Sequence, residues 1–155
     1  MSGMNKTLQI MAASFGLLMF QQPAAPRLMP YPQAKQPALE LPPYQLPRPN
    51  DVIRATYKFA AEHPEVLGYM PCFCGCEMMG HKSNASCFVK TRARNGDVTA
   101  WDNHGIVCPM CLAVGEQAMR MHASGSSVQE IRAAVEEKYG GITEFKTPTP
   151  APPRR

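Results

Sequence analysis

The sequence predicts a mainly α-helical small domain, with three helices around an irregular cysteine-rich loop and a short β-hairpin. Proline placement bounds the domain: 13 of the 16 prolines in the 155-residue chain lie before residue 50 or after residue 147, which leaves residues 51–145 as the folding unit. Helix-start and helix-stop signals recur on both sides of a stretch rich in Cys, Gly and Ser, and this pattern favours helices that flank a loop.

The first predicted element is a helix over residues 52–63. Its apolar side chains form an imperfect stripe, and Asn50 or Asp51 can cap its start. Pro64 limits the helix, and residues 64–68 predict a short second turn. Residues 70–88 contain too many Gly, Pro, Ser and Asn residues to form a long regular element, so they are predicted to be the cysteine-rich loop.

A hairpin and a second helix follow the loop. Asn95-Gly96 is a turn dipeptide between two β-prone runs, so a short β-hairpin is predicted within residues 88–101. The second helix begins after Cys108, which stands at the N-cap position, and Pro109 suits the first helical position. It is predicted to run to about residue 123, before a glycine.

The last helix has the clearest signals. Ser127 and Glu130 form a capping box at its start, and Gly140 can cap its end. Between them Ile131, Val135 and Tyr139 recur every four residues, which places them on one face of a helix.

The sequences before and after the folding unit, residues 1–50 and 146–155, indicate export and disorder. Residues 1–25 resemble a secretory signal peptide, because Lys6 precedes an apolar run, residues 8–20, that is too short to span a bilayer comfortably. We therefore expect the protein outside the cytoplasm, periplasmic or secreted, with membrane contact only through an uncleaved N-terminal segment. Residues 26–50 predict a disordered proline-rich linker and residues 146–155 a disordered proline-rich tail.

The charge of the domain argues against nucleic-acid binding. The whole chain has a net charge of +4, but residues 51–145 carry nine basic and eleven acidic side chains, a net charge of −2. A domain that binds phosphate backbones needs a basic face of its own. The sequence also contains no nucleophile elbow, phosphate loop or paired-carboxylate signature, so it leans against an enzyme.

Two groups of cysteines and histidines carry the functional signal. One lies in the loop and the other at the start of the second long helix, and together they predict eight metal ligands: Cys72, Cys74, Cys76, His81, Cys87, His104, Cys108 and Cys111. A disulfide between Cys72 and Cys74 would close a strained ring, so alternating cysteines suit a metal better. Cys108 and Cys111 lie one turn apart at a helix N-terminus, which favours the thiolate form and predicts that they are the most reactive thiols.

Copper(I) is the ion that this donor set favours. It prefers soft thiolate and thioether ligands, and four methionines lie beside the cysteines: Met70, Met78, Met79 and Met110. Zinc is the alternative, although four ligands would satisfy it and leave two cysteines over. Haem attachment is excluded, because Leu112 rather than histidine follows the second cysteine of CPMC. Asp102 can orient the ring of His104 through a hydrogen bond.

The residues therefore predict an exported metal-binding protein that buffers copper(I), or zinc, or transfers it to a metal-trafficking partner. Two alternatives stay open. One is a thiol–disulfide oxidoreductase that uses Cys108 and Cys111. The other is a structural or partner-binding domain held by three disulfides, as is common for small secreted domains.

Three blocks of sequence resemble one family. PCFCGCEMMGHKSNASCFV, WDNHGIVCPMC and SVQEIRAAVEEKYG occur in this order within residues 57–140. They are similar to blocks of the bacterial PCYCGC-motif family of exported proteins, with Phe73 in place of the family's tyrosine. The resemblance implies a domain type rather than an activity, and its recurring positions map onto the eight predicted ligands. Many members look like lipoproteins, whereas here no cysteine follows the apolar run.

Overall fold

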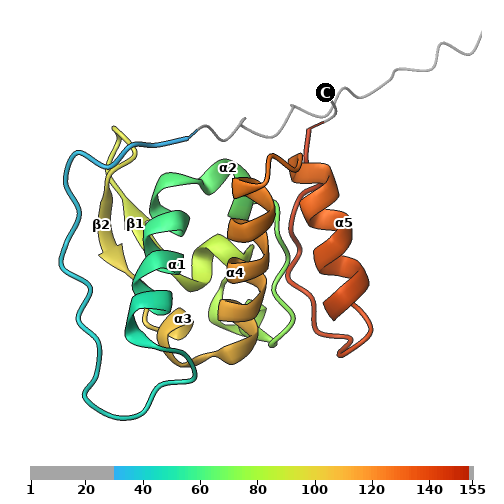
Figure 1. Cartoon of the computed structure of the whole chain (residues 1–155), viewed down its shortest axis with the longest axis horizontal. Helices are drawn as coiled ribbons and strands as arrows, with labels where there is room; N and C mark the ends of the chain where they lie inside the picture. The colour runs from blue at the N-terminus through green and yellow to red at the C-terminus, as the bar shows by residue number, and fades with distance from the viewer. Residues whose placement is uncertain (1–29, 154–155) are drawn as a thin grey trace, which may run out of the picture.

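Three long helices and a hairpin form the framework of a mainly helical small domain (Figure 1). The computed structural model describes residues 30–153. The long helices in this range are α1 (Asn50–Glu62), α4 (Pro109–Ala123) and α5 (Val128–Tyr139), and the strands are β1 (Val89–Arg92) and β2 (Val98–Trp101). Two short helices, α2 (Pro64–Leu67) and α3 (His104–Val107), make five α-helices among the described residues. The sequence predicted α2 as a short turn and did not predict α3.

Helix α4 lies at the centre of the packing. It contacts α1, α2, α3 and α5, and Figure 1 shows it between α1 and α5. Leu112 and Val114 of α4 are fully buried, as are Ile131 and Val135 of α5. Burying one side chain of this size contributes about 1.5–3 kcal/mol. The start of α4, which carries Cys111, is therefore held in place by the core.

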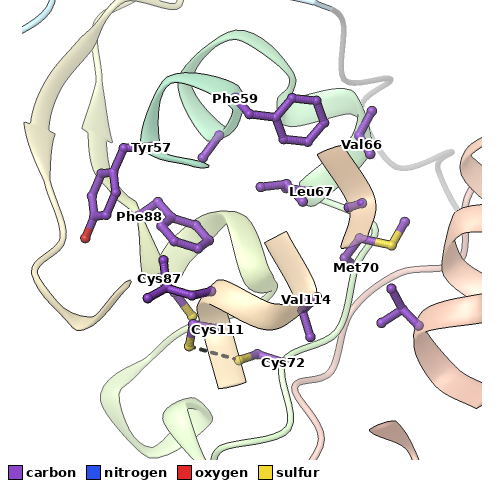
Figure 2. Close-up of a cluster of buried hydrophobic side chains, with 14 of the residues drawn as sticks. Tyr57, Phe59, Val66, Leu67, Met70, Cys72, Cys87, Phe88, Cys111 and Val114 are labelled. Atoms are coloured by element: carbon purple, nitrogen blue, oxygen red, sulfur yellow. Dashed lines mark hydrogen bonds between the residues drawn. The ribbon is translucent and has the colours of Figure 1, made fainter. Parts of the chain in front are cut away.

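Aromatic rings join α1 to the hairpin. The ring of Tyr57 meets Phe88 edge to face, with 5.1 Å between ring centroids, and meets Trp101 at 5.5 Å. The Tyr57 hydroxyl donates a hydrogen bond of 2.5 Å to the carbonyl oxygen of Asp102. Burial raises the pKa of Tyr57, so the hydroxyl remains a donor. Figure 2 shows Phe88 beside Cys87, so this aromatic group adjoins the sulfur-bearing side of the core.

The predicted hairpin is present and antiparallel. Val89 pairs with Trp101 and Arg92 with Val98, with irregular register between these pairs. Gly96 adopts φ +90° in the connecting turn, a conformation that glycine reaches without strain. Arg92 donates hydrogen bonds of 2.8 Å to the carbonyls of Ala60 and Ala61, which lie in the last turn of α1 and lack helical partners. The hairpin thereby caps the end of α1.

The helix ends confirm two predictions and correct one. Cys108 is the N-cap of α4 with Pro109 at its first turn, and both bonds of the Ser127–Glu130 capping box are formed at α5. The prediction that Asn50 or Asp51 caps α1 is wrong. Pro49 occupies the N-cap position there without a side-chain hydrogen bond, because the helix begins at Asn50, two residues earlier than the apolar stripe indicated.

The segment before α1 lies against the domain. Residues 30–49 have no regular secondary structure, as their prolines imply, but Gln33 accepts a hydrogen bond of 2.8 Å from the amide of Val98 and donates one of 3.1 Å to the Ala61 carbonyl. The indole of Trp101 donates to the Pro37 carbonyl at 2.9 Å. Composition predicted a disordered spacer here. In the described part, the leucines between the prolines pack on the core instead, namely Leu39, Leu41 and Leu46.

The segment after α5 also packs. Thr147 is only 2% exposed. Its amide donates to the Cys72 carbonyl at 3.0 Å, and its hydroxyl accepts from the Cys72 amide at 2.8 Å. Arg132 holds the same segment through a bond of 2.9 Å to the Pro150 carbonyl. Residues that composition assigned to a disordered tail therefore pair with the cysteine-rich loop, because a proline-rich chain can still offer amides and hydroxyls to it.

The predicted signal peptide, residues 1–25, lies outside the described residues. Within residues 30–153, no helix has the length and apolar character needed to cross a membrane.

Candidate metal centre

All eight predicted ligands come from the loop and from the start of α3 and α4. The loop supplies five of them, of which Cys76 begins a 3-10 helix (Cys76–Met79) and Cys87 ends another (Asn84–Cys87). His104 begins α3, Cys108 lies between α3 and α4, and Cys111 is in the first turn of α4. Seven of the side chains form two groups that touch each other, and His81 lies beside the second group.

The first group consists of Cys74, His104, Cys108 and Cys111, each with one ligand atom within 4.8 Å of the others. The sulfur of Cys74 lies 3.4 Å from Nε2 of His104 and 3.6 Å from the sulfur of Cys111. Three thiols and one imidazole are a donor set that fits tetrahedral zinc or a copper(I) thiolate site.

The second group consists of Cys72, Cys76 and Cys87, whose sulfurs also lie within 4.8 Å of one another. All three side chains are buried, and the sulfurs of Cys76 and Cys87 are 3.7 Å apart. Nδ1 of His81 lies 3.5 Å from the Cys87 sulfur, at the edge of this group. Three converging thiols are suited to a soft ion that accepts few ligands.

Cys72 joins the two groups. Its sulfur lies 3.2 Å from that of Cys111, the contact drawn in Figure 2, and 3.5 Å from that of Cys74. None of the six cysteines forms a disulfide in the structure. Through these contacts of Cys72 the six sulfurs form one continuous cluster.

Two glycines let the loop fold back on itself. Gly75 and Gly80 bracket the 3-10 helix Cys76–Met79 with φ +76° and +85°, a left-handed conformation that other residues rarely adopt. The backbone therefore turns sharply between Cys74 and Cys76, so their sulfurs enter different groups. In an extended strand these alternating cysteines would have shared one face.

Gly105 allows α3 to approach the loop. A Cβ atom at this position would lie 2.5 Å from the ring of Phe88 and 2.7 Å from the carbonyl oxygen of Cys87. Only a residue without a side chain permits this contact. The contact places the ends of α3, with His104 and Cys108, beside Cys87.

Asp102 lies between the two histidines but does not act as the sequence predicted. Its Oδ1 accepts a 2.9 Å hydrogen bond from the backbone amide of His104 rather than from the ring. Its Oδ2 lies 3.5 Å from Nε2 of His81. A carboxylate behind an imidazole fixes the ring and makes it a better metal ligand. Asp102 therefore faces the ring of His81, whereas its hydrogen bond to His104 goes to the backbone.

The pKa values of the thiols follow from their contacts with one another. Hydrogen bonds from Cys111 and Cys74 lower the pKa of Cys72. The hydrogen bonds of Cys111 with Cys108 and Cys72, together with burial, raise its own pKa. Neighbouring thiols thus favour the thiolate at Cys72 and the protonated thiol at Cys111 in the metal-free cluster. At Cys111 these effects oppose that of the helix N-terminus, which favours the thiolate.

The methionines divide between core and surface. Met70 is fully buried in the core, and Met110 packs partly buried against it. Met78 and Met79 are 85% and 56% exposed. The donors that the fold gathers are therefore thiols and imidazoles.

Two supporting residues had no signal in the sequence. Asn84 is fully buried and donates a 3.1 Å hydrogen bond to the carbonyl of Cys111, which ties the loop to α4. Thr147 holds the backbone of Cys72 from the tail. Their roles depend on contacts across 27 and 75 residues of chain, so local patterns could not reveal them.

Fold and site together define a small helical domain with Cys/His clusters that could hold a metal ion. The chain belongs to the PCYCGC family, because the family model described as "Protein of unknown function with PCYCGC motif" matches residues 33–152. This confirms the resemblance of the three sequence blocks, and the match includes most of the proline-rich segment that packs against the domain. Comparisons with curated proteins and with solved structures found no match.

Proposed function

We propose that this protein binds copper(I) in the six-cysteine cluster and buffers or transfers the ion outside the cytoplasm. The observation that carries the proposal is the continuity of the cluster through Cys72, whose sulfur lies within 3.5 Å of sulfurs in the first group. Thiolates shared between neighbouring ions are what a polynuclear copper(I) site requires, and copper(I) is the soft ion for which thiolate ligands select.

Burial supports the same proposal. Cys72, Cys76, Cys87 and Cys111 are 0–1% exposed, so a bound ion would be shielded from water and oxidants. Of the two CPMC thiols, Cys111 is buried and Cys108 is half-buried, so the oxidoreductase alternative would have to use Cys108 as the attacking thiol.

Zinc is the second candidate, and one observation favours it. Cys74, His104, Cys108 and Cys111 are a complete set of four zinc ligands. If zinc is the natural ion, the first group is its site, and Cys72, Cys76 and Cys87 would need His81 as a fourth ligand for a second ion.

Anaerobic metal titration tests the proposal. The reduced protein is titrated with copper(I) and, separately, with zinc(II), against a chromophoric chelator of each ion, and stoichiometry is read by native mass spectrometry. We expect more than one copper(I) ion per chain, bound cooperatively, with the luminescence of a copper(I)–thiolate cluster. Binding of a single zinc ion with no copper(I) retained against the chelator would contradict the copper proposal.

Export is tested separately. We expect full-length protein expressed in a bacterial host to be recovered outside the cytoplasm, because its apolar run at residues 8–20 is typical of a signal peptide. Replacing two leucines of that run, Leu17 and Leu18, with Glu should retain the protein in the cytoplasm. Identical fractionation of both forms would contradict export by this segment.

A further inference from the structure

A second set of metal-ligand side chains lies away from the cysteines. His63, Glu65 and His122 each have one ligand atom within 4.8 Å of the other two. His63 lies at the junction between α1 and α2, Glu65 is in α2, and His122 is in the last turn of α4. No local pattern in the sequence joins these residues, because His63 and His122 are far apart in the chain.

This second set is separated from the thiol cluster by the length of α4. Cys111 and His122 lie at opposite ends of that helix, eleven residues apart, which corresponds to about 16 Å at 1.5 Å per residue. Figure 2 likewise shows Phe59, a neighbour of both histidines, across the core from Cys72 and Cys111. An ion held at one end of α4 therefore does not share ligands with the other end.

The three side chains of this set lie close together. Nδ1 of His63 lies 2.8 Å from Oε1 of Glu65, and the ring centroids of His63 and His122 are 4.5 Å apart. The side chains of His63 and Glu65 are 28% and 16% exposed. Because these side chains are partly exposed, an ion from solution can reach them.

One oxygen of the Glu65 carboxylate is available to a ligand. Oε2 of Glu65 is buried and has no hydrogen-bond partner among the described residues. Leaving such a group unpaired costs about 1–3 kcal/mol, and more when it is charged. Arg92 interacts electrostatically with Glu65, but its hydrogen bonds go to the carbonyls of Ala60, Ala61 and Gly96.

Ring stacking alone does not account for the arrangement. Phe59 lies 4.8 Å from the ring of His63 and 5.5 Å from that of His122, so an aromatic cluster explains why the two imidazoles approach. It does not explain the unpaired oxygen of Glu65.

The ring of His122 can act as a metal ligand. Burial has the largest effect on its pKa and the neighbouring His63 the next largest, and both lower it. The ring is therefore neutral at neutral pH and has a free lone pair.

We propose that His63, Glu65 and His122 form a separate site for a divalent ion of the zinc class. Two imidazoles and a carboxylate are ligands of borderline hardness that zinc(II) accepts, with a fourth position left for water. The proposal goes beyond the copper(I) function, because it concerns a harder donor set at the other end of α4. The protein would therefore hold ions of two different chemical classes.

Histidine NMR tests this site independently of the thiol cluster. The full-length protein is first given copper(I) and then titrated with zinc(II), while the ring signals of all four histidines are followed. We expect the signals of His63 and His122 to shift and saturate at one equivalent of zinc(II). The signals of His81 and His104 report the thiol cluster separately, so failure of copper(I) binding would be seen there without affecting the result at His63 and His122.

Matched variants complete the test. Glu65→Gln and His122→Gln should weaken zinc(II) binding at this site by roughly tenfold or more, whereas Glu62→Gln should not. Glu62 is the control because it is a neighbouring carboxylate paired with Lys58 instead. If His122→Gln does not fold, Glu65→Gln alone decides. Unshifted His63 and His122 signals in excess zinc(II), or unchanged affinity in Glu65→Gln, would overturn the proposal.

Discussion

Cys72 links the two groups of the sulfur cluster. It belongs to the group with Cys76 and Cys87 and also lies 3.2 Å from Cys111 and 3.5 Å from Cys74 of the other group. Cys108, by contrast, belongs to one group and is half-buried at its edge. The two cysteines thus contribute differently to any ion that the cluster holds.

We therefore expect Cys72→Ser to reduce copper(I) capacity more than Cys108→Ser. Loss of Cys72 removes a ligand from one group and separates it from the other, so bound copper(I) should fall by more than one ion per chain and the affinity of the rest by roughly 10- to 100-fold. Cys108→Ser should lower affinity without dividing the cluster. The measurement is anaerobic copper(I) competition with a chelator, and equal losses in the two variants would contradict a shared sulfur.

At the scale of elements, α3 determines where two ligands lie. This four-residue helix carries His104 at its start and is followed by Cys108. Its contact with the loop depends on Gly105, where a Cβ atom would meet the Phe88 ring at 2.5 Å and a backbone oxygen at 2.7 Å. The backbone oxygen cannot rotate away, so the helix itself would have to shift.

We expect Gly105→Ala to destabilise the protein by about 1–2 kcal/mol, because overpacking costs about 1–3 kcal/mol and alanine recovers up to about 1 kcal/mol in helix propensity. It should also weaken metal binding, since His104 and Cys108 move with α3. Urea unfolding and metal competition measure the two effects. Gly141→Ala is the control, because a Cβ atom there has nothing within 4 Å, and a loss of stability equal to that of Gly105→Ala would argue against the close contact.

Most elements were predictable because their signals are local. The capping box at Ser127 and Glu130 and the cap at Cys108 lie within one helical turn, and both predictions are confirmed. Helix α3 was missed because four residues are too few to show a periodicity. The cap of α1 was placed wrongly because Pro49, which can enter an N-cap position without a side-chain bond, competed with Asn50.

At the scale of the whole molecule, the proline-rich flanks support the site. Thr147, in the segment after α5, exchanges two hydrogen bonds with the backbone of Cys72. The segment before α1 covers the hairpin through Gln33 and Pro37. The family match over residues 33–152 spans the same packed range.

We expect Thr147→Val to cost about 1–3 kcal/mol, because the buried amide of Cys72 would lose its acceptor. The reactivity of the thiols toward a soluble disulfide should also increase, since Cys72 is held less tightly. Thr143→Val is the matched control, as the hydroxyl of Thr143 accepts only from the exposed Phe145 amide. Urea unfolding of both variants measures the difference, and equal midpoints would show that the tail does not hold the loop.

The sequence by itself determined the three long helices and the hairpin, and it selected the seven residues that form the two Cys/His groups, together with His81 beside them. These follow from the periodicity of apolar residues, from capping residues and from cysteine spacing, which are local in the chain. Only the tertiary structure decided how seven of these residues divide into two groups joined at Cys72, that the segments 30–49 and 146–153 pack, and that His63, Glu65 and His122 meet. The physical reason is that these contacts close long loops, and side-chain packing in the core selects which loops close.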